Sequence, residues 1–176
     1  SKMTSQVRGL DQAVRNGNDA ISMIQTADGA LIEVSNMLQR MRELAVQAAT
    51  GTNGDTDKAA LQTEFAALRS QIDSIATGTT WNGEKVFSQS GIPAAKDFQV
   101  GANAGQKISV TFNNFKTADA AGVDANATVS DSKFASVNST DTGTPRPISS
   151  ITLASDGGAA IYMLDNALAN VSSERA

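Results

Sequence analysis

Apolar residues recur along the first 48 positions at alternating steps of three and four, which is the spacing of a heptad seam. The seam has two halves that meet at one shortened step: Met3, Val7, Leu10, Val14, Gly17, Ile21 and Ile24, then Ala27, Leu31, Val34, Leu38, Met41, Ala45 and Ala48. This periodicity predicts a single helix over residues 1–50. A helix of about 50 residues is roughly 75 Å long, which indicates an elongated molecule.

Two shorter stripes of the same kind follow. The polar, glycine-containing stretch at residues 50–55 ends the first helix. A second helix is predicted over 56–77 and a third over 156–176, with the apolar positions Leu61, Phe65, Leu68, Ile72 and Ile75, and Ile161, Leu164, Leu168 and Val171. Three such stripes are buried by packing together, so the predicted fold is mainly α, an elongated coiled-coil-like bundle of two N-terminal helices and one C-terminal helix.

Between the second and third helices the pattern changes to that of strands. Asn82-Gly83, placed between Trp81 and Val86, is a strong two-residue hairpin signal. Alternating apolar residues at 98–112 predict further strands, so β-hairpins are expected over about 79–112. Residues 116–147 have few large apolar side chains, and we interpret them as a short variable surface excursion that is no independent domain.

Composition narrows the possible functions. The net charge of −4 argues against a nucleic-acid partner, and no apolar run is long enough to span a membrane. The chain has no histidine and no cysteine, which removes the commonest general base, the commonest metal ligands and the thiolate nucleophile. We therefore expect no enzymatic activity and no cofactor.

The order and spacing of several segments resemble bacterial flagellin. They are residues 3–10, 13–19, 25–31, 98–105 and 165–176, together with Leu38-Gln39-Arg40-Met41-Arg42-Glu43-Leu44-Ala45-Val46-Gln47-Ala48 and Asn82-Gly83-Glu84-Lys85-Val86-Phe87. The resemblance implies a core rod domain formed by residues 1–115 and 148–176. It also implies a structural subunit of the flagellar filament that packs against other flagellin subunits. Such a protein is extracellular and is exported by the flagellar type III apparatus without a cleaved signal peptide.

Both ends of the chain look cut through continuing helices, because the first seam starts at residue 3 and the last ends within five residues of the C-terminus. We expect a core fragment that lacks the terminal helices of the family. Such a fragment should be soluble, monomeric and unable to polymerise.

A candidate recognition surface lies in residues 38–48. Helical geometry puts Arg40, Leu44 and Gln47 together, nearly opposite the seam, so Leu44 is predicted to be an apolar side chain exposed on a polar face. A single exposed leucine is also ordinary on a protein surface. The resemblance implies more: the matching arginine and leucine, with a glutamate of the next helix, form the surface that host Toll-like receptor 5 binds and that contributes to subunit packing. The candidate residues are Gln39, Arg40, Leu44, Gln47 and Glu64.

Three alternatives remain. A hook–filament junction protein of the same superfamily should have a divergent 38–48 segment. A surface adhesin or ligand-binding flagellin would need a concave site within 116–147. A flagellin with a metalloprotease insert would need the His-Glu-x-x-His motif, and this chain has no histidine.

Overall fold

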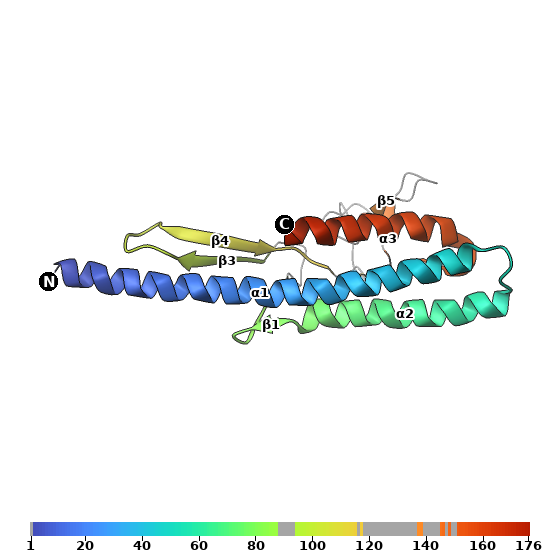
Figure 1. Cartoon of the computed structure of the whole chain (residues 1–176), viewed down its shortest axis with the longest axis horizontal. Helices are drawn as coiled ribbons and strands as arrows, with labels where there is room; N and C mark the ends of the chain where they lie inside the picture. The colour runs from blue at the N-terminus through green and yellow to red at the C-terminus, as the bar shows by residue number, and fades with distance from the viewer. Residues whose placement is uncertain are drawn as a thin grey trace, which may run out of the picture.

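A computed structural model of the chain describes residues 2–87, 94–115, 117, 137–138, 145–146, 148 and 151–176. Three helices dominate it: α1 (Lys2–Ala49), α2 (Asp55–Gly78) and α3 (Leu153–Arg175). Figure 1 shows α1 running the whole length of a rod, with α2 and α3 on opposite sides of its C-terminal half. The predicted mainly α, elongated fold is confirmed. The third helix begins three residues earlier than predicted, after the N-cap residue Thr152.

Two antiparallel hairpins follow α2. Strands β1 (Thr80–Trp81) and β2 (Glu84–Lys85) are joined by Asn82 and Gly83, whose φ angles of 50° and 80° are both positive. That is the backbone of the tight hairpin turn that the sequence predicts. Strands β3 (Ala94–Gln99) and β4 (Lys107–Phe112) pair with Phe98 opposite Ile108. A short pair, β5 (Val137–Asn138) and β6 (Pro145–Arg146), precedes α3.

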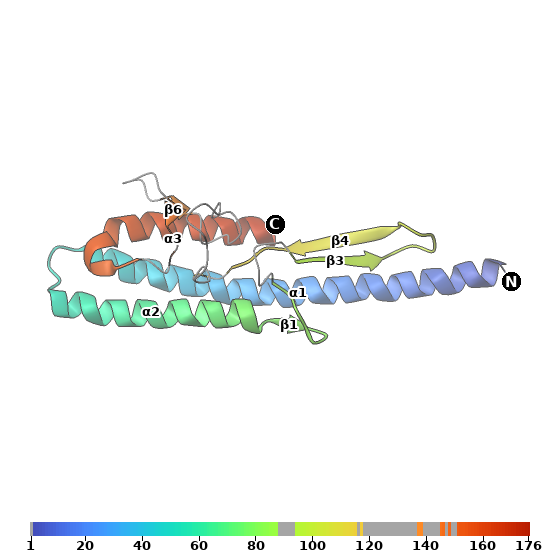
Figure 2. The ribbon, with the colours of Figure 1, turned by 180° about the vertical axis from the view of Figure 1, so that it is seen from behind.

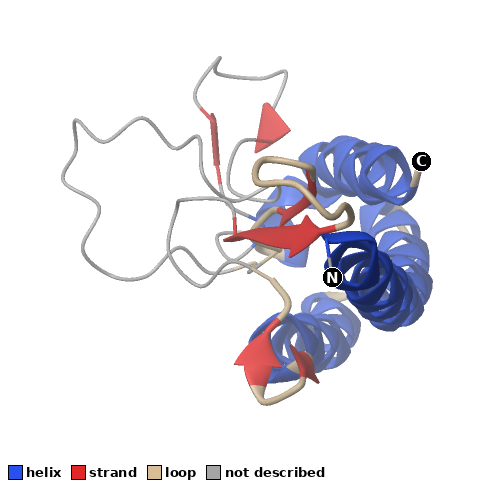
Figure 3. Ribbon diagram, turned by 90° about the vertical axis from the view of Figure 1, so that its left-hand side faces the viewer, coloured by secondary structure: helices blue, strands red, loops and turns tan. Residues whose placement is uncertain are grey.

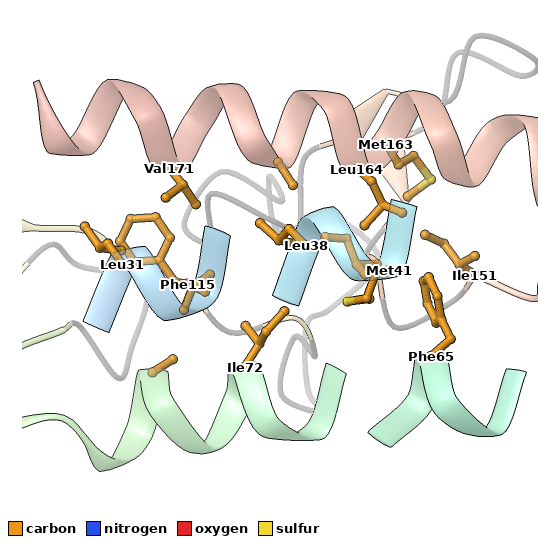
Figure 4. Close-up of a cluster of buried hydrophobic side chains, with 14 of the residues drawn as sticks. Leu31, Leu38, Met41, Phe65, Ile72, Phe115, Ile151, Met163, Leu164 and Val171 are labelled. Atoms are coloured by element: carbon orange, nitrogen blue, oxygen red, sulfur yellow. The ribbon is translucent and has the colours of Figure 1, made fainter. Parts of the chain in front are cut away.

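The core lies where the three helices meet. Figure 4 shows Leu38 and Met41 of α1 between Leu164 and Val171 of α3 and Phe65 and Ile72 of α2. Each of these six side chains is at most 1% exposed. The second half of the predicted α1 seam is therefore buried as expected, because a helix packs on either side of it.

The first half of that seam is exposed, which contradicts the predicted burial. Its large side chains are 43–79% exposed: Met3, Val7, Leu10, Val14, Ile21 and Ile24. The described elements beside this half are the β-hairpins, and Figure 3 shows them on one side of α1. The β3–β4 hairpin covers a face of small residues about a quarter turn away, where Ala13 and Ala20 are buried.

Contacts with the hairpins explain why that face carries small residues. A side chain on Gly9 would meet Ala102, between β3 and β4, at 3.4 Å. Asn16 Nδ2 donates to the carbonyl of Gln99 at 2.8 Å. The backbone of the β3–β4 hairpin can approach α1 closely only because no large side chain lies between them.

The chain on both sides of residues 118–147 is held by α2. The backbone N–H of Thr117 donates to Asp73 Oδ1 at 2.6 Å, and its hydroxyl donates to Asp73 Oδ2 at 2.8 Å. Farther on, Gln62 bonds to the backbone of Ile151 and Leu153. Phe115, Ile148 and Ile151 are buried in the bundle core. Figure 2 shows the rod from behind, with α2 and α3 along the C-terminal half of α1 and the β3–β4 hairpin along its N-terminal half.

The predicted surface excursion at 116–147 falls almost wholly outside the described residues, and so does the pocket that an adhesin would need there. Its separation from a core rod stays a prediction.

Candidate partner-binding surface

An exposed polar surface lies along the line where α1 and α2 pack together. The chain turns back after α1, so α2 runs antiparallel to it and brings Glu64 opposite Arg40 (Figure 1). Arg40 Nε donates a hydrogen bond to Glu64 Oε1 at 2.8 Å, and Arg40 Nη2 lies 2.8 Å from the same oxygen as an ion-pair contact. Two of the predicted site residues, 24 positions apart, are therefore in direct contact.

A third charged residue joins this pair. Glu43, one turn after Arg40 on α1, accepts a hydrogen bond from Arg40 Nη1 at 3.0 Å. The hydrogen bonds that Arg40 donates to Glu43 and Glu64 raise the pKa of Arg40 above its ordinary value. The side chains of Arg40, Glu43 and Glu64 are 50%, 68% and 45% exposed, so this ion-pair cluster faces solvent. Sequence reasoning missed Glu43, although its spacing of three from Arg40 is a recognised signal for a helix ion pair.

Leu44 is not an exposed apolar residue. Only 1% of it is accessible, and it belongs to the main hydrophobic core. The prediction placed Leu44 opposite the seam, but α2 packs against α1 on the side that carries Arg40, and Leu44 lies four positions after Arg40. Leu44 therefore lies in the contact between α1 and α2 and supports the exposed surface from beneath.

The two glutamines extend the polar surface. Gln47 is exposed and lies seven positions after Arg40, which is two helical turns on the same face. Gln39 is also exposed and lies at the edge of this face, four positions before Glu43. The structure thus gathers Gln39, Arg40, Gln47 and Glu64 on one exposed surface, with Leu44 below it.

A cavity of about 330 Å³ lies elsewhere on the rod, near the C-terminal end of α3. Its charged lining is already paired: Arg175 Nε donates to Asp28 Oδ1 at 2.7 Å, and Glu174 accepts two hydrogen bonds from Asn113. The rest of the lining is Gln25 and the apolar side chains Ile24, Leu31 and Phe112.

The described part of the chain contains no group of three or more acidic side chains that could hold a metal ion. None of its helices combines the length and apolar character needed to cross a bilayer.

Comparison with known proteins agrees with the resemblance noted in the sequence. The family model for the bacterial flagellin N-terminal helical region matches residues 1–91. Flagellin B of Vibrio anguillarum is 42% identical over 117 residues, which are 66% of this chain and 31% of that protein. A flagellin of Escherichia coli O127:H6 is 46% identical over 110 residues, which are 62% of this chain and 20% of that protein. The chain thus spans a third or less of the length of these relatives.

Solved structures extend the similarity beyond the N-terminal helices. The crystal structure of Bacillus cereus flagellin matches with a TM-score of 0.65 and 29% identity, over 92% of this chain and 78% of that one. The structure of FliC from Burkholderia pseudomallei matches with a TM-score of 0.62 over 88% of this chain and 95% of that one, and at 23% identity it supports the fold alone. Because the family model covers more than half of the chain, including the helices that carry the candidate surface, this chain belongs to the bacterial flagellin family.

Proposed function

We propose that the chain is the core rod of a subunit of the bacterial flagellar filament. The observation that carries this proposal is the rod itself, a 48-residue helix with other helices on only half of its length, in a member of the flagellin family. A long, narrow shape suits lateral stacking into a filament wall. The apolar side chains left exposed along the first half of α1 are typical of a surface that is buried in a larger assembly.

This role implies other flagellin subunits as partners and an extracellular location, reached through the flagellar type III apparatus. It also implies a structural protein with neither catalytic activity nor a cofactor. The absence of histidine and cysteine from the chain supports that part of the proposal.

Assembly can be tested by sedimentation. We expect this chain to stay in the supernatant under conditions that polymerise full-length flagellin, because it spans only 31% of the length of Flagellin B of Vibrio anguillarum. Filaments formed by this chain alone would contradict the expectation that assembly needs more of the protein than this part. A full-length relative whose residues matching 2–78 are replaced by those of this chain should still form filaments; if it does not, the filament role fails.

We further propose that Gln39, Arg40, Gln47 and Glu64, supported from beneath by Leu44, form a partner-binding surface for a neighbouring subunit or for host Toll-like receptor 5. The contact between Arg40 and Glu64 supports this proposal, because the contact brings together charged groups from two helices at an exposed position. Leu44 contributes by holding α2 against α1 and makes no contact of its own with the partner, because its side chain is buried.

Binding of the receptor ectodomain to immobilised variants tests this surface. Arg40→Ala and Glu64→Ala are expected to weaken binding at least tenfold, which corresponds to about 1.4 kcal/mol. Arg8→Ala is the matched control, because Arg8 is an exposed arginine of the same helix that pairs with no carboxylate among the described residues. If Arg40→Ala and Arg8→Ala bind as tightly as the parent chain, this surface is not the receptor site.

A further inference from the structure

Glu43 is the member of the ion-pair cluster that the proposed function does not yet use. It lies on α1, its side chain is 68% exposed, and its only described contact is with Arg40. We propose that Glu43 is a positioning residue for recognition at this surface: together with Glu64 it holds the Arg40 guanidinium in one orientation before a partner arrives. This inference rests on the proposed partner-binding surface and adds a residue and a mechanism to it.

The hydrogen bonds of Arg40 support a fixed guanidinium. Arg40 Nε donates to Glu64 Oε1 and Nη1 donates to Glu43 Oε2, while Nη2 lies 2.8 Å from Glu64 Oε1 as an ion-pair contact. The two carboxylates come from different helices and reach the planar group from different nitrogens. A guanidinium with a single partner could still turn about its long aliphatic chain, whereas two partners on different nitrogens leave it little freedom.

Holding Arg40 in place helps binding for an entropic reason. Ordering a long side chain during association opposes binding, and the part that is already ordered in the free protein does not have to be ordered again. Arginine has five N–H groups, and two of them donate hydrogen bonds to Glu64 and Glu43. Three N–H groups therefore remain for acceptor oxygens of a partner.

The cluster also defines the chemistry of that partner. One arginine and two glutamates carry a net charge of −1, and both carboxylates have lone pairs beyond those that bind Arg40. The complementary surface is that of a protein which offers carbonyl or carboxylate oxygens to Arg40 and a basic or N–H-bearing group beside them. The inference therefore favours a protein partner of mixed polarity.

Glu43 can be tested with little risk to the fold. Its side chain is exposed, and alanine is the best helix former, so Glu43→Ala should leave the thermal transition of the chain almost unchanged. Glu33→Ala is the matched control, because Glu33 is an exposed glutamate of the same helix without an ion-pair partner among the described residues.

The experiment is a double-mutant cycle, measured as binding of the Toll-like receptor 5 ectodomain to the parent chain, Glu43→Ala, Arg40→Ala and the double variant. We expect Glu43→Ala to weaken binding about three- to tenfold, the range expected when one long side chain must be ordered on association. We expect the double variant to bind like Arg40→Ala alone, since a residue that acts through Arg40 has no effect once Arg40 is absent. Glu43→Gln keeps an acceptor oxygen for Nη1 and should fall between the parent chain and Glu43→Ala.

The outcomes separate this inference from the proposed function. If Arg40→Ala weakens binding and Glu43→Ala does not differ from Glu33→Ala, Glu43 has no positioning role and the partner surface stands. If Glu43→Ala weakens binding equally with and without Arg40, Glu43 contacts the partner directly and the positioning mechanism is wrong. If Arg40→Ala itself has no effect, the proposed surface fails, and the inference fails with it.

Discussion

The start of α3 depends on a side chain from another helix, which makes Gln62 a sensitive position for a test of stability. The N-cap residue Thr152 makes no side-chain capping bond to α3. Instead, Gln62 Oε1 of α2 accepts the backbone N–H of Leu153 at 2.8 Å, and Gln62 Nε2 donates to the carbonyl of Ile151 at 3.4 Å. Gln62 thus satisfies one of the backbone donors that every helix leaves unpaired in its first turn.

Replacing Gln62 with alanine removes this acceptor while Leu153 stays only 1% exposed. Loss of a helix cap typically costs about 0.5–2 kcal/mol, and a buried unsatisfied donor costs about 1–3 kcal/mol. The longer bond to Ile151 adds little, so we expect a loss of about 1–2 kcal/mol in the free energy of unfolding. For a chain of this size that lowers Tm by roughly 2–8 °C. Urea denaturation followed by circular dichroism measures the loss directly.

Two further variants isolate the cause. Gln71→Ala makes the same chemical change at an exposed position of the same helix, so it controls for helix propensity. Gln62→Glu keeps an acceptor oxygen and places a negative charge at the N-terminus of α3, so it should lose less stability than Gln62→Ala. If Gln62→Ala and Gln71→Ala unfold at the same urea concentration, or if Gln62→Glu is as unstable as Gln62→Ala, the capping role is refuted.

Three other changes have expected outcomes. Leu44→Ala should lower the free energy of unfolding by about 2–5 kcal/mol, as for a core leucine, whereas a loss below about 0.5 kcal/mol in urea denaturation would mean that Leu44 is exposed. Gly101→Ala puts a Cβ 2.6 Å from the Cβ of Gln106 and should speed amide exchange in β3 and β4 while α2 stays protected; unchanged exchange would contradict the close packing. Hydrogen bonds from Lys107 and Ser109 lower the pKa of Asp97, so their stabilising effect is present above the unfolded-state pKa and is lost as pH falls through the lower folded-state pKa. The protection of the hairpin amides, measured relative to their intrinsic exchange rate at each pH, should therefore fall below about pH 4, and Asp97→Asn should remove most of that change.

Local features of the sequence predicted the three helices and the tight turn between β1 and β2. Helix α1 was expected over 1–50 and extends over Lys2–Ala49, because a heptad pattern with a single shortened step and no proline suits a helix. The turn at Asn82 and Gly83 was also predictable, since both residues tolerate the positive φ that a two-residue hairpin requires. The predicted first residue of α3 was less accurate. The first backbone N–H of this helix is satisfied by Gln62, which is 91 positions away in the chain.

The candidate surface was predicted only in part. Arg40 and Glu64 were both named, and a family resemblance was needed to connect them, because no short-range pattern links residues on two helices. Glu43 was missed although its spacing to Arg40 is local. Leu44 was predicted to be exposed but is buried, because its burial depends on where α2 packs.

The sequence by itself determined which residues share a face of each helix. Only the tertiary structure decided which of those faces are buried. The seam of α1 has the same spacing in both halves, yet Leu38 is fully buried between α2 and α3, while Leu10 is 52% exposed where the β3–β4 hairpin covers a neighbouring face. The physical reason is that periodicity follows from the geometry of one helix, whereas burial requires a second surface whose position is set by distant parts of the chain.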